Sequence, residues 1–425
     1  MDVRDRFDRQ LRIAGWDQTR LTGGCVAVYG RDWAGAFTVL ALRSLGVGKI
    51  AWLGRPCPAT ETLARWMLDD SCPPDGCAVD EYPSEVEYGP ELSWAIGERR
   101  VDAFVCCAED VAAHHASQAF ARELGAVYLA GTTARGGWYG FGAPPYLGPA
   151  KQEPVAAMAL AALLADSVRA ILCPLPSDVL APEGVLGLQT PAPAAPARVG
   201  TVAVVGAGGI GVHAAIAAMA ALDCELHIVD FDRVELTNLN RQGLYTVEHA
   251  RTGANKAVAA RDTLIRLFPG ARVFSLPARI ESASLSGLAK IGPGVLLSAV
   301  DNARTRLAIQ DIGCSLGIPV VQGGSDVFAA DCYTQDVGGA LLDEQMHGAL
   351  SAATAREPEE QHRRGCAGDP SYVVPGTMAG ALMAYRLAQL SKRRCGLPPI
   401  HWRSGSLPTE HRSTADDVAL GSPDR

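Results

Sequence analysis

The chain has 425 residues, of which 48% are hydrophobic and 20% charged, and this composition excludes a disordered or fibrous protein. Its formal net charge is −8, and no run of Lys or Arg indicates the basic surface of a nucleic-acid-binding protein. The first ten residues are too charged for a secretory signal, and the longest apolar stretch, residues 155–165, is too short to span a bilayer. We therefore expect a cytoplasmic protein of two or three domains, without a nucleic-acid or membrane partner.

The 12 cysteines are scattered along the chain, and no two of them have the C-x-x-C spacing. A structural zinc site typically uses two such pairs, so we expect no zinc. In a reducing compartment most of these thiols should be buried as small apolar side chains.

Strand and helix signals alternate along the chain and repeat in two halves. In the first half they are strands near 26–29, 50–53, 102–105 and 126–131, and a long helix over 154–172. The second half repeats the series with strands near 201–205, 226–229, 294–297 and 319–323, and a helix over 376–391. Alternating β and α signals predict parallel sheets, so we expect an α/β protein with two tandem, doubly wound domains.

The domain boundaries follow from composition. An Ala/Pro-rich linker is predicted over 181–199, between a first domain at 1–180 and a second at 200–395. The polar residues 396–425 show no periodicity and are expected to form a disordered tail.

A glycine-rich turn, Gly206-Ala-Gly208-Gly209-Ile-Gly211, follows the first strand of the second half and opens a helix. In this context the glycines allow a tight turn and a close backbone approach to phosphate, and the helix N-terminus attracts an anion. Asp230 ends the next strand, where a carboxylate can accept hydrogen bonds from ribose hydroxyls. A ribonucleotide is predicted, with NAD, FAD and ATP all possible.

Charged residues after Asp230 favour ATP. Arg241 offers a bidentate fork for phosphate, Lys256 a point charge, and Asp301 a hard oxygen ligand for magnesium. A triphosphate needs such side chains, whereas backbone amides suffice for a dinucleotide. Each residue has an ordinary alternative: Arg241 and Lys256 can be solvated surface charges, and Asp301 a helix N-cap.

Together these residues resemble the ThiF/MoeB/HesA family, relatives of the ubiquitin-activating enzymes. The matching segments are GAGGIG at 206–211, VDFDRVELTNLNRQ at 229–242, Lys256, and VDN at 300–302. The resemblance implies two Rossmann-like halves in a pseudo-dimer and Mg·ATP-dependent adenylation of a carboxylate. It also implies the roles of the site residues: Asp301 would bind Mg²⁺, and the nucleotide would be held by Gly206, Gly208, Gly209, Gly211, Asp230, Asp232, Asn238, Arg241, Gln242 and Lys256.

The first half resembles the same family more faintly. The segment DRFDRQ at 5–10 is similar to the family's N-terminal signature, and the resemblance implies that Arg9 reaches the γ-phosphate. The turn at 30–35 keeps only Gly30 and Gly35, and Glu109 stands where Asp301 would. We interpret residues 1–180 as a degenerate copy that lends Arg9 in cis; the alternative is that Arg9 is a helix-surface charge paired with Asp5.

The acceptor of the acyl adenylate is left open. Cys366 lies where many relatives carry a thiol that captures the acyl group, and an unreactive loop cysteine is the alternative. We predict an adenylyltransferase or ligase-type enzyme that acts on a carrier protein, a peptide or a small acid in biosynthesis, with ATP and Mg²⁺. A homodimer of pseudo-dimers is possible. The alternatives are a non-catalytic nucleotide- or partner-binding scaffold and an NAD-dependent oxidoreductase, for which no hydride-site acid or base is evident.

Overall fold

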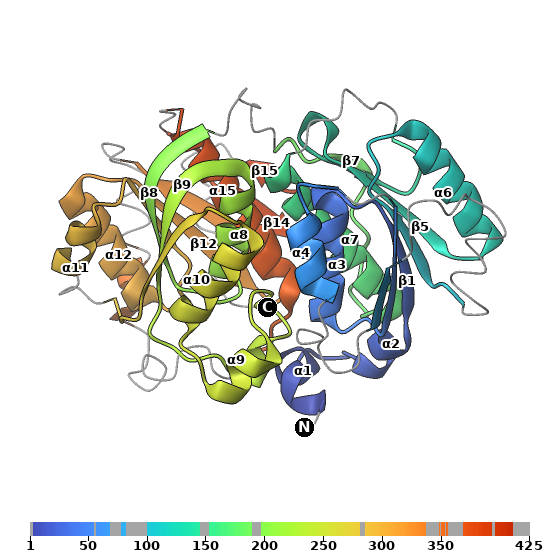
Figure 1. Cartoon of the computed structure of the whole chain (residues 1–425), viewed down its shortest axis with the longest axis horizontal. Helices are drawn as coiled ribbons and strands as arrows, with labels where there is room; N and C mark the ends of the chain where they lie inside the picture. The colour runs from blue at the N-terminus through green and yellow to red at the C-terminus, as the bar shows by residue number, and fades with distance from the viewer. Residues whose placement is uncertain are drawn as a thin grey trace.

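The computed structural model describes residues 3–54, 57–68, 78–81, 100–144, 153–188, 197–280, 285–336, 348, 350–352, 354–355, 369–392 and 396–410. Two mixed sheets lie side by side, with helices packed between them and on their outer faces (Figure 1). The α/β fold class predicted from the sequence is confirmed.

The first sheet has the strand order β3-β2-β1-β4-β5-β6-β7. Its first five strands are parallel, and β6 and β7 are antiparallel additions. The strands are β1 (Cys25–Tyr29), β2 (Lys49–Leu53), β3 (Ala78–Glu81), β4 (Ala103–Cys106), β5 (Val127–Thr132), β6 (Trp138–Gly140) and β7 (Gly184–Val185). The helices of this half are α1 (Val3–Leu11), α2 (Gln18–Gly23), α3 (Trp33–Leu45), α4 (Glu61–Leu68), α6 (Val111–Glu123), η1 (Ala134–Gly136) and α7 (Pro154–Leu172).

The second sheet repeats this order as β10-β9-β8-β11-β12-β13-β14-β15, again with five parallel strands followed by antiparallel ones. The strands are β8 (Ala197–Val205), β9 (Leu222–Val229), β10 (Arg272–Leu276), β11 (Val295–Ser298), β12 (Val320–Asp326), β13 (Ala329–Gln335), β14 (Ile400–Arg403) and β15 (Thr409–Glu410). The helices are α8 (Gly211–Ala221), η2 (Leu236–Asn238), α9 (Val247–Thr252), α10 (Lys256–Leu267), α11 (Leu285–Ile291), α12 (Ala303–Leu316) and α15 (Val373–Leu390).

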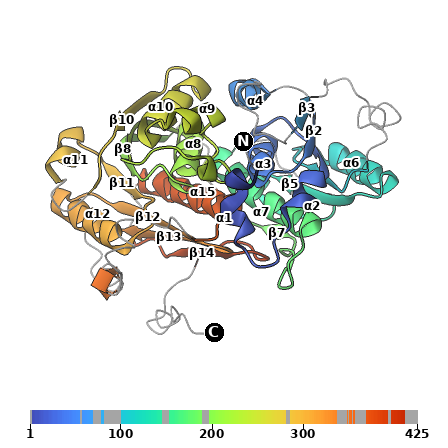
Figure 2. The same ribbon diagram turned by 90° about the horizontal axis from the view of Figure 1, so that it is seen from below.

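Four apolar helices, α3, α7, α8 and α15, form the core between the two sheets (Figures 1 and 2). Small residues let them approach closely: a Cβ on Gly380 of α15 would lie 2.6 Å from the Cβ of His213 in α8. On the outer faces, α6 covers the first sheet, while α11 and α12 cover the second. Both sheets are therefore covered on two sides, which explains their continuous apolar strands.

Among the described helices, only α7 has the length and hydropathy of a membrane span, and 89% of that span is buried inside the protein. Two charged residues in it, Asp166 and Arg169, bond at 3.0 Å. Asp166 also accepts hydrogen bonds from Tyr372 (3.1 Å) and Ser404 (2.6 Å) of the second half. The helix is thus a core element that joins the two halves.

Two predicted boundaries are wrong. The first sheet takes up Gly184–Val185 as β7 and the second begins at Ala197, so a linker over 181–199 is too long. The expected tail contains β14 and β15, because alternate residues of β14, Ile400 and Trp402, are buried against the core. Residues 411–425 lie outside the described part of the chain.

Candidate functional site

A cavity of about 640 Å³ opens at the carboxyl ends of the strands of the second sheet. Ligand sites of open α/β sheets lie at this edge, where the strand order reverses between β8 and β11. Most predicted site residues line it: Arg9, Gly206, Gly208, Gly209, Asp230, Asp232, Asn238, Arg241, Gln242, Lys256 and Asp301. The structure therefore brings together residues that lie up to 292 positions apart, from Arg9 to Asp301.

The glycine-rich turn has the geometry that its sequence predicts. Gly206 has a φ of +95°, and a Cβ on Gly211 would lie 1.8 Å from the Gly206 carbonyl oxygen. Gly211 therefore serves the close packing of α8 on β8 and does not line the cavity. A Cβ on Gly208 would meet no described atom within 4 Å, so this residue faces the opening.

Two side chains hold the turn from opposite sides. Asp230 accepts the Ala207 N–H at 2.7 Å, and the Tyr245 hydroxyl donates to the Ala207 carbonyl at 2.7 Å. Burial raises the pKa of Asp230, against the lowering influence of Lys256 and the two N–H donors. The role of Tyr245 was missed from the sequence because no spacing rule links it to the turn.

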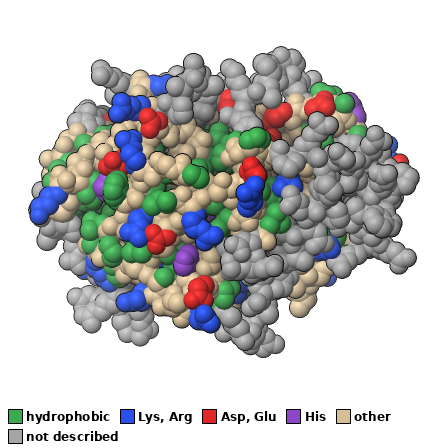
Figure 3. Space-filling view, viewed as in Figure 1, with side chains coloured by type: hydrophobic (Ala, Val, Ile, Leu, Met, Phe, Trp, Pro, Cys, Tyr) green, Lys and Arg blue, Asp and Glu red, His purple; other side chains and the backbone are tan. Residues whose placement is uncertain are grey.

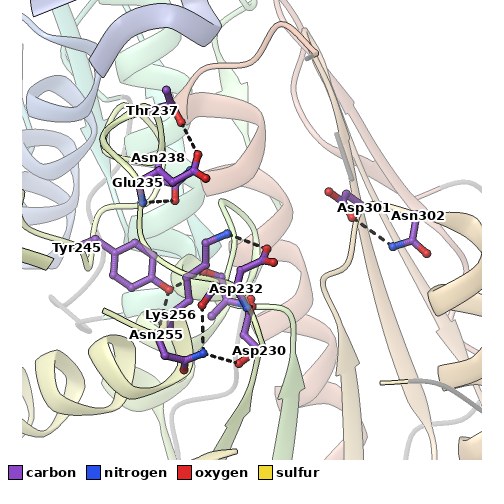
Figure 4. A network of polar contacts seen from close by, with 11 residues as sticks. Asp230, Asp232, Glu235, Thr237, Asn238, Tyr245, Asn255, Lys256, Asp301 and Asn302 are labelled. Carbon is purple, nitrogen blue, oxygen red and sulfur yellow. Dashed lines mark hydrogen bonds and ion pairs between the residues drawn. The ribbon is translucent and has the colours of Figure 1, made fainter. Parts of the chain in front are cut away.

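Lys256 and Asp232 form an ion pair at the cavity, with 3.1 Å between Nζ and the carboxylate (Figure 4). The lysine is the first residue of α10, whose N-cap is Asn255. Asn255 also donates to the backbone carbonyls of Asp230 and Asp232, which ties α10 to the loop after β9. The lysine side chain is mostly buried, so it is not the solvated surface charge of the alternative interpretation.

The short helix η2 and the turn that follows it present the polar residues of the NLNRQ segment. Asn238 accepts the N–H of Glu235 at 3.0 Å, which fixes the turn. Arg241 donates from Nη1 to the Thr237 carbonyl (2.6 Å) and to Asn240 Oδ1 (2.9 Å). Gln242 is buried, and its Oε1 accepts no hydrogen bond from the described part of the chain.

Arg9 reaches this cavity from α1 of the first half. It is 6% exposed and donates from Nη1 to the Asp369 carbonyl at 3.3 Å. The arginine therefore lies in the cavity of the same chain and is not a helix-surface charge.

Asp301 follows β11 and is exposed at the cavity. The N-cap of α12 is the next residue, Asn302, whose side chain accepts the Thr305 N–H at 2.8 Å. The alternative that Asp301 caps this helix is therefore wrong, and its carboxylate belongs to the cavity wall (Figure 4).

The equivalent turn in the first half differs at the N-terminus of its helix. A Cβ on Gly35 would lie 2.0 Å from the Gly30 carbonyl oxygen, so the close approach of helix and strand is kept. However, the side chain of Asp32 caps α3 through the Gly35 N–H (3.2 Å), whereas no described side chain caps α8. The Glu109 carboxylate accepts hydrogen bonds from the Thr133 N–H and the Thr133 hydroxyl, at 2.7 Å each.

Other predicted and unpredicted residues complete the picture. Cys366 lies outside the described residues. Cys332 is buried, and burial raises the pKa of its thiol to about 12. Sequence reasoning missed three further cations that line the cavity. Arg233 lies within the VDFDRVELTNLNRQ segment but was given no role, whereas Arg279 and Arg306 stand outside the recognised motifs. On the face seen in Figure 3, basic side chains are scattered among acidic ones and form no continuous patch among the described residues.

The ThiF family model matches residues 197–400. The second half of the chain is a ThiF family domain. This domain spans the second sheet from β8 to the start of β14 and contains every cavity residue discussed above except Arg9. The match does not extend to the first half, so its interpretation as a degenerate copy stays a prediction, supported by the shared strand order.

Curated relatives of the ThiF domain are adenylyltransferases by name. The chain is 40% identical over 124 residues to a sulfur carrier protein adenylyltransferase of Thermus thermophilus, which is 29% of this chain and 44% of that protein. It is 36% identical over 124 residues to the adenylyltransferase and sulfurtransferase MOCS3 of Drosophila virilis, covering 29% of this chain and 27% of that protein. The chain thus spans less than half of the length of these relatives. Among solved structures, E. coli MccB with ATP matches with a TM-score of 0.38 and 18% identity, over 50% of this chain and 63% of that one.

Proposed function

We propose that the ThiF domain binds Mg·ATP in the cavity and adenylates a carboxylate. The observation that carries this proposal is the contrast between two equivalent helices. The side chain of Asp32 caps the N-terminus of α3. No side chain in the described part of the chain caps α8, which faces a cavity lined by Arg9, Arg241 and Lys256. An uncapped helix N-terminus beside cations is suited to a polyanion.

The chemistry of the lining residues fits a ribonucleoside triphosphate. Asp230 uses one oxygen for Ala207 and the other for Asp232, and a carboxylate can accept about four hydrogen bonds, so it can still accept from a ribose. Gly208 leaves room for a phosphate group at the N-terminus of α8. Arg9, Arg241 and Lys256 supply charge for the remaining phosphates.

The site also fits magnesium. Mg²⁺ is bound through one or two carboxylates, substrate phosphates and waters, and Asp301 is an exposed carboxylate at the cavity. When bound, the ion would neutralise charge on the phosphates of the leaving group. Among the described residues no group of three or more His, Cys, Asp or Glu side chains forms a metal cluster.

In the adenylation step no covalent bond to the protein would form, and the protein would act by positioning the substrates and stabilising charge. A carboxylate oxygen attacks the α-phosphorus, the bond from this phosphorus to its bridging oxygen breaks, and pyrophosphate leaves with the bonding electrons. Lys256, Arg241 and Arg9 would hold the triphosphate in line and stabilise charge on the departing pyrophosphate. We propose a carrier protein, a peptide or a small acid as the carboxylate, and a sulfur or amine nucleophile, Cys366 included, as the acceptor.

Calorimetric titration of the purified protein with Mg·ATP tests this proposal, with NADH titrated in parallel. Lys256→Ala should weaken Mg·ATP binding at least tenfold, since a hydrogen-bonded charge contributes about 1.5–3 kcal/mol. Lys290→Ala, at an exposed lysine of α11, is the matched control and should bind like the wild type. Binding of NADH without binding of ATP would refute the proposal and favour an oxidoreductase.

A nucleotide-binding scaffold without activity is distinguished by a second step. Once Mg·ATP binding is shown, candidate carrier proteins, peptides and acids are screened for pyrophosphate release. Tight ATP binding without pyrophosphate release from any of them would favour the scaffold.

A further inference from the structure

We infer that Asn240 is a positioning residue that holds Arg9 and Arg241 in one geometry at the phosphate end of the cavity. This inference rests on the proposed function and extends it. Asn240 does not line the cavity and is fully buried, so it does not act by touching a ligand.

The side chain of Asn240 uses both ends of its amide. Its Oδ1 accepts from Arg241 Nη1 at 2.9 Å. Its Nδ2 donates to Gln10 Oε1 at 3.1 Å and to the Ser371 carbonyl at 3.2 Å. One buried side chain therefore joins three segments: helix α1 at the residue next to Arg9, the segment before α15, and the turn that carries Arg241.

The link to Arg9 is short. Gln10 follows Arg9 in α1, and the Ser371 N–H donates to the Arg9 carbonyl at 3.2 Å. The Arg9 side chain in turn donates to Asp369, two residues before Ser371. Residues 369–371 therefore bond to Asn240 through the Ser371 carbonyl, and to Arg9 through the Ser371 N–H and the Asp369 carbonyl. In this way Asn240 helps to hold the segment that positions Arg9.

The link to Arg241 is direct. The guanidinium carries five N–H donors in a planar fork, and the two bonds to Asn240 and Thr237 both use Nη1. Fixing one nitrogen sets the plane of the whole fork, which is the geometric requirement for bidentate phosphate binding. Without Asn240 the guanidinium keeps its charge and loses the anchor that Asn240 Oδ1 provides.

A positioning role predicts selectivity between nucleotides. If Arg9 and Arg241 hold the outer phosphates, Asn240→Ala should weaken Mg·ATP binding about tenfold and change AMP binding less than twofold. In an Arg9→Ala Arg241→Ala background, adding Asn240→Ala should change Mg·ATP affinity less than twofold, because the residues it positions are gone. Asn240→Ser, which keeps a small polar group, serves if the alanine variant does not fold.

Calorimetry with Mg·ATP and with AMP measures both effects. Gln335→Ala is the control: it removes another buried amide, bonded to Gln310 and Cys314 and remote from the cavity lining, and should leave both affinities unchanged. Equal losses of ATP and AMP affinity in Asn240→Ala, or no loss of either, would overturn the inference while leaving the proposed function standing. A wild-type protein that fails to bind Mg·ATP would overturn the proposed function and the inference with it.

Discussion

Asp301 keeps its carboxylate at the cavity because its neighbour takes over the helix cap. Asn302 accepts the Thr305 N–H and donates to Asp301 Oδ1 at 3.4 Å. Of these two adjacent residues, Asn302 therefore caps α12 and Asp301 lines the cavity. The sequence alone does not assign them, since both residue types are good N-caps.

This division predicts a specific effect of Asp301→Asn. The variant keeps the size of the side chain and loses the charge that would hold Mg²⁺, so ATP binding should lose its dependence on magnesium. We expect Mg·ATP affinity to fall about tenfold, and ATP affinity measured with a chelator to be unchanged. Asp311→Asn, at an exposed acid of α12, is the control. If Asp301→Asn retained the full magnesium dependence, the metal assignment would be wrong.

Asp32 supplies a second residue-level prediction. Burial, and then Glu109, raise its pKa from 3.8 to about 7. The folded state therefore binds more protons than the unfolded state between these values, so the contribution of Asp32 to stability is complete below about pH 4 and is lost as the pH rises through 7.

Asp32→Asn keeps an oxygen for the Gly35 N–H and cannot ionise. The free energy of unfolding of the variant, minus that of the wild type, should therefore be about 2 kcal/mol higher at pH 8.5 than at pH 5.5, so the variant gains relative stability at the higher pH. Urea titrations at the two pH values measure this difference. If the difference in unfolding free energy between the variant and the wild type were the same at pH 5.5 and pH 8.5, Asp32 would not ionise within this pH range.

At the scale of elements, the turn before α8 contains one glycine that serves packing and another that lines the cavity. Gly211 permits the approach of α8 to β8, while Gly208 faces open space. The Cβ of an alanine at 211 would overlap the Gly206 carbonyl oxygen, which requires the helix to shift.

We therefore expect Gly211→Ala to destabilise the fold by about 3 kcal/mol. Gly208→Ala should change stability by less than about 1 kcal/mol and weaken Mg·ATP binding about tenfold, because its methyl group enters the phosphate region. Urea denaturation measures the stability of the two variants, and calorimetry measures their affinity for Mg·ATP. If Gly208→Ala bound Mg·ATP like the wild type, phosphate would not lie at this turn.

Local patterns predicted the elements well and the boundaries poorly. The inner parallel strands and both long core helices were predicted from runs of apolar residues with turn residues between them, but the parallel strands at one edge of each sheet, β3 and β10, were not predicted. The antiparallel strands β7, β14 and β15 were missed because they are two to four residues long and lie in Pro- or Ser-rich sequence. Only tertiary pairing stabilises such short strands.

The candidate site shows the same limit. Residues within one motif, such as Asp230 and Asn238, were found because their spacing is local. Arg306 lines the cavity, and Tyr245 bonds the glycine-rich turn behind it, from positions that no motif marks. The positions of these two side chains depend on how α9, α10 and α12 pack around the second sheet, and local sequence patterns do not specify that packing.

At the scale of the molecule, the two halves share one core and one site. The helices α7 and α15 pack together, and Asp166 connects them to Tyr372 and Ser404. This packing places α1 of the first half against η2, so Arg9 enters a cavity built by the second half. The first half therefore contributes a residue to the cavity of the second half, although the N-terminus of its own helix α3 is capped by Asp32.

If Arg9 acts in cis, mixing two defective variants should not restore binding. Arg9→Ala and Lys256→Ala each remove one cation of the same cavity, and neither can supply the missing one to the other. We expect the stoichiometry of tight Mg·ATP sites in an equimolar mixture, measured by calorimetry, to stay near zero. Recovery of tight sites on mixing would show that Arg9 is exchanged between chains.

The most direct test of the account is an experimental structure with magnesium and a non-hydrolysable ATP analogue. The account predicts the triphosphate at the N-terminus of α8, with Lys256, Arg241 and Arg9 of the same chain on its phosphates and Mg²⁺ at Asp301. A nucleotide bound elsewhere, or a triphosphate at α8 that none of these three cations contacts, would contradict it.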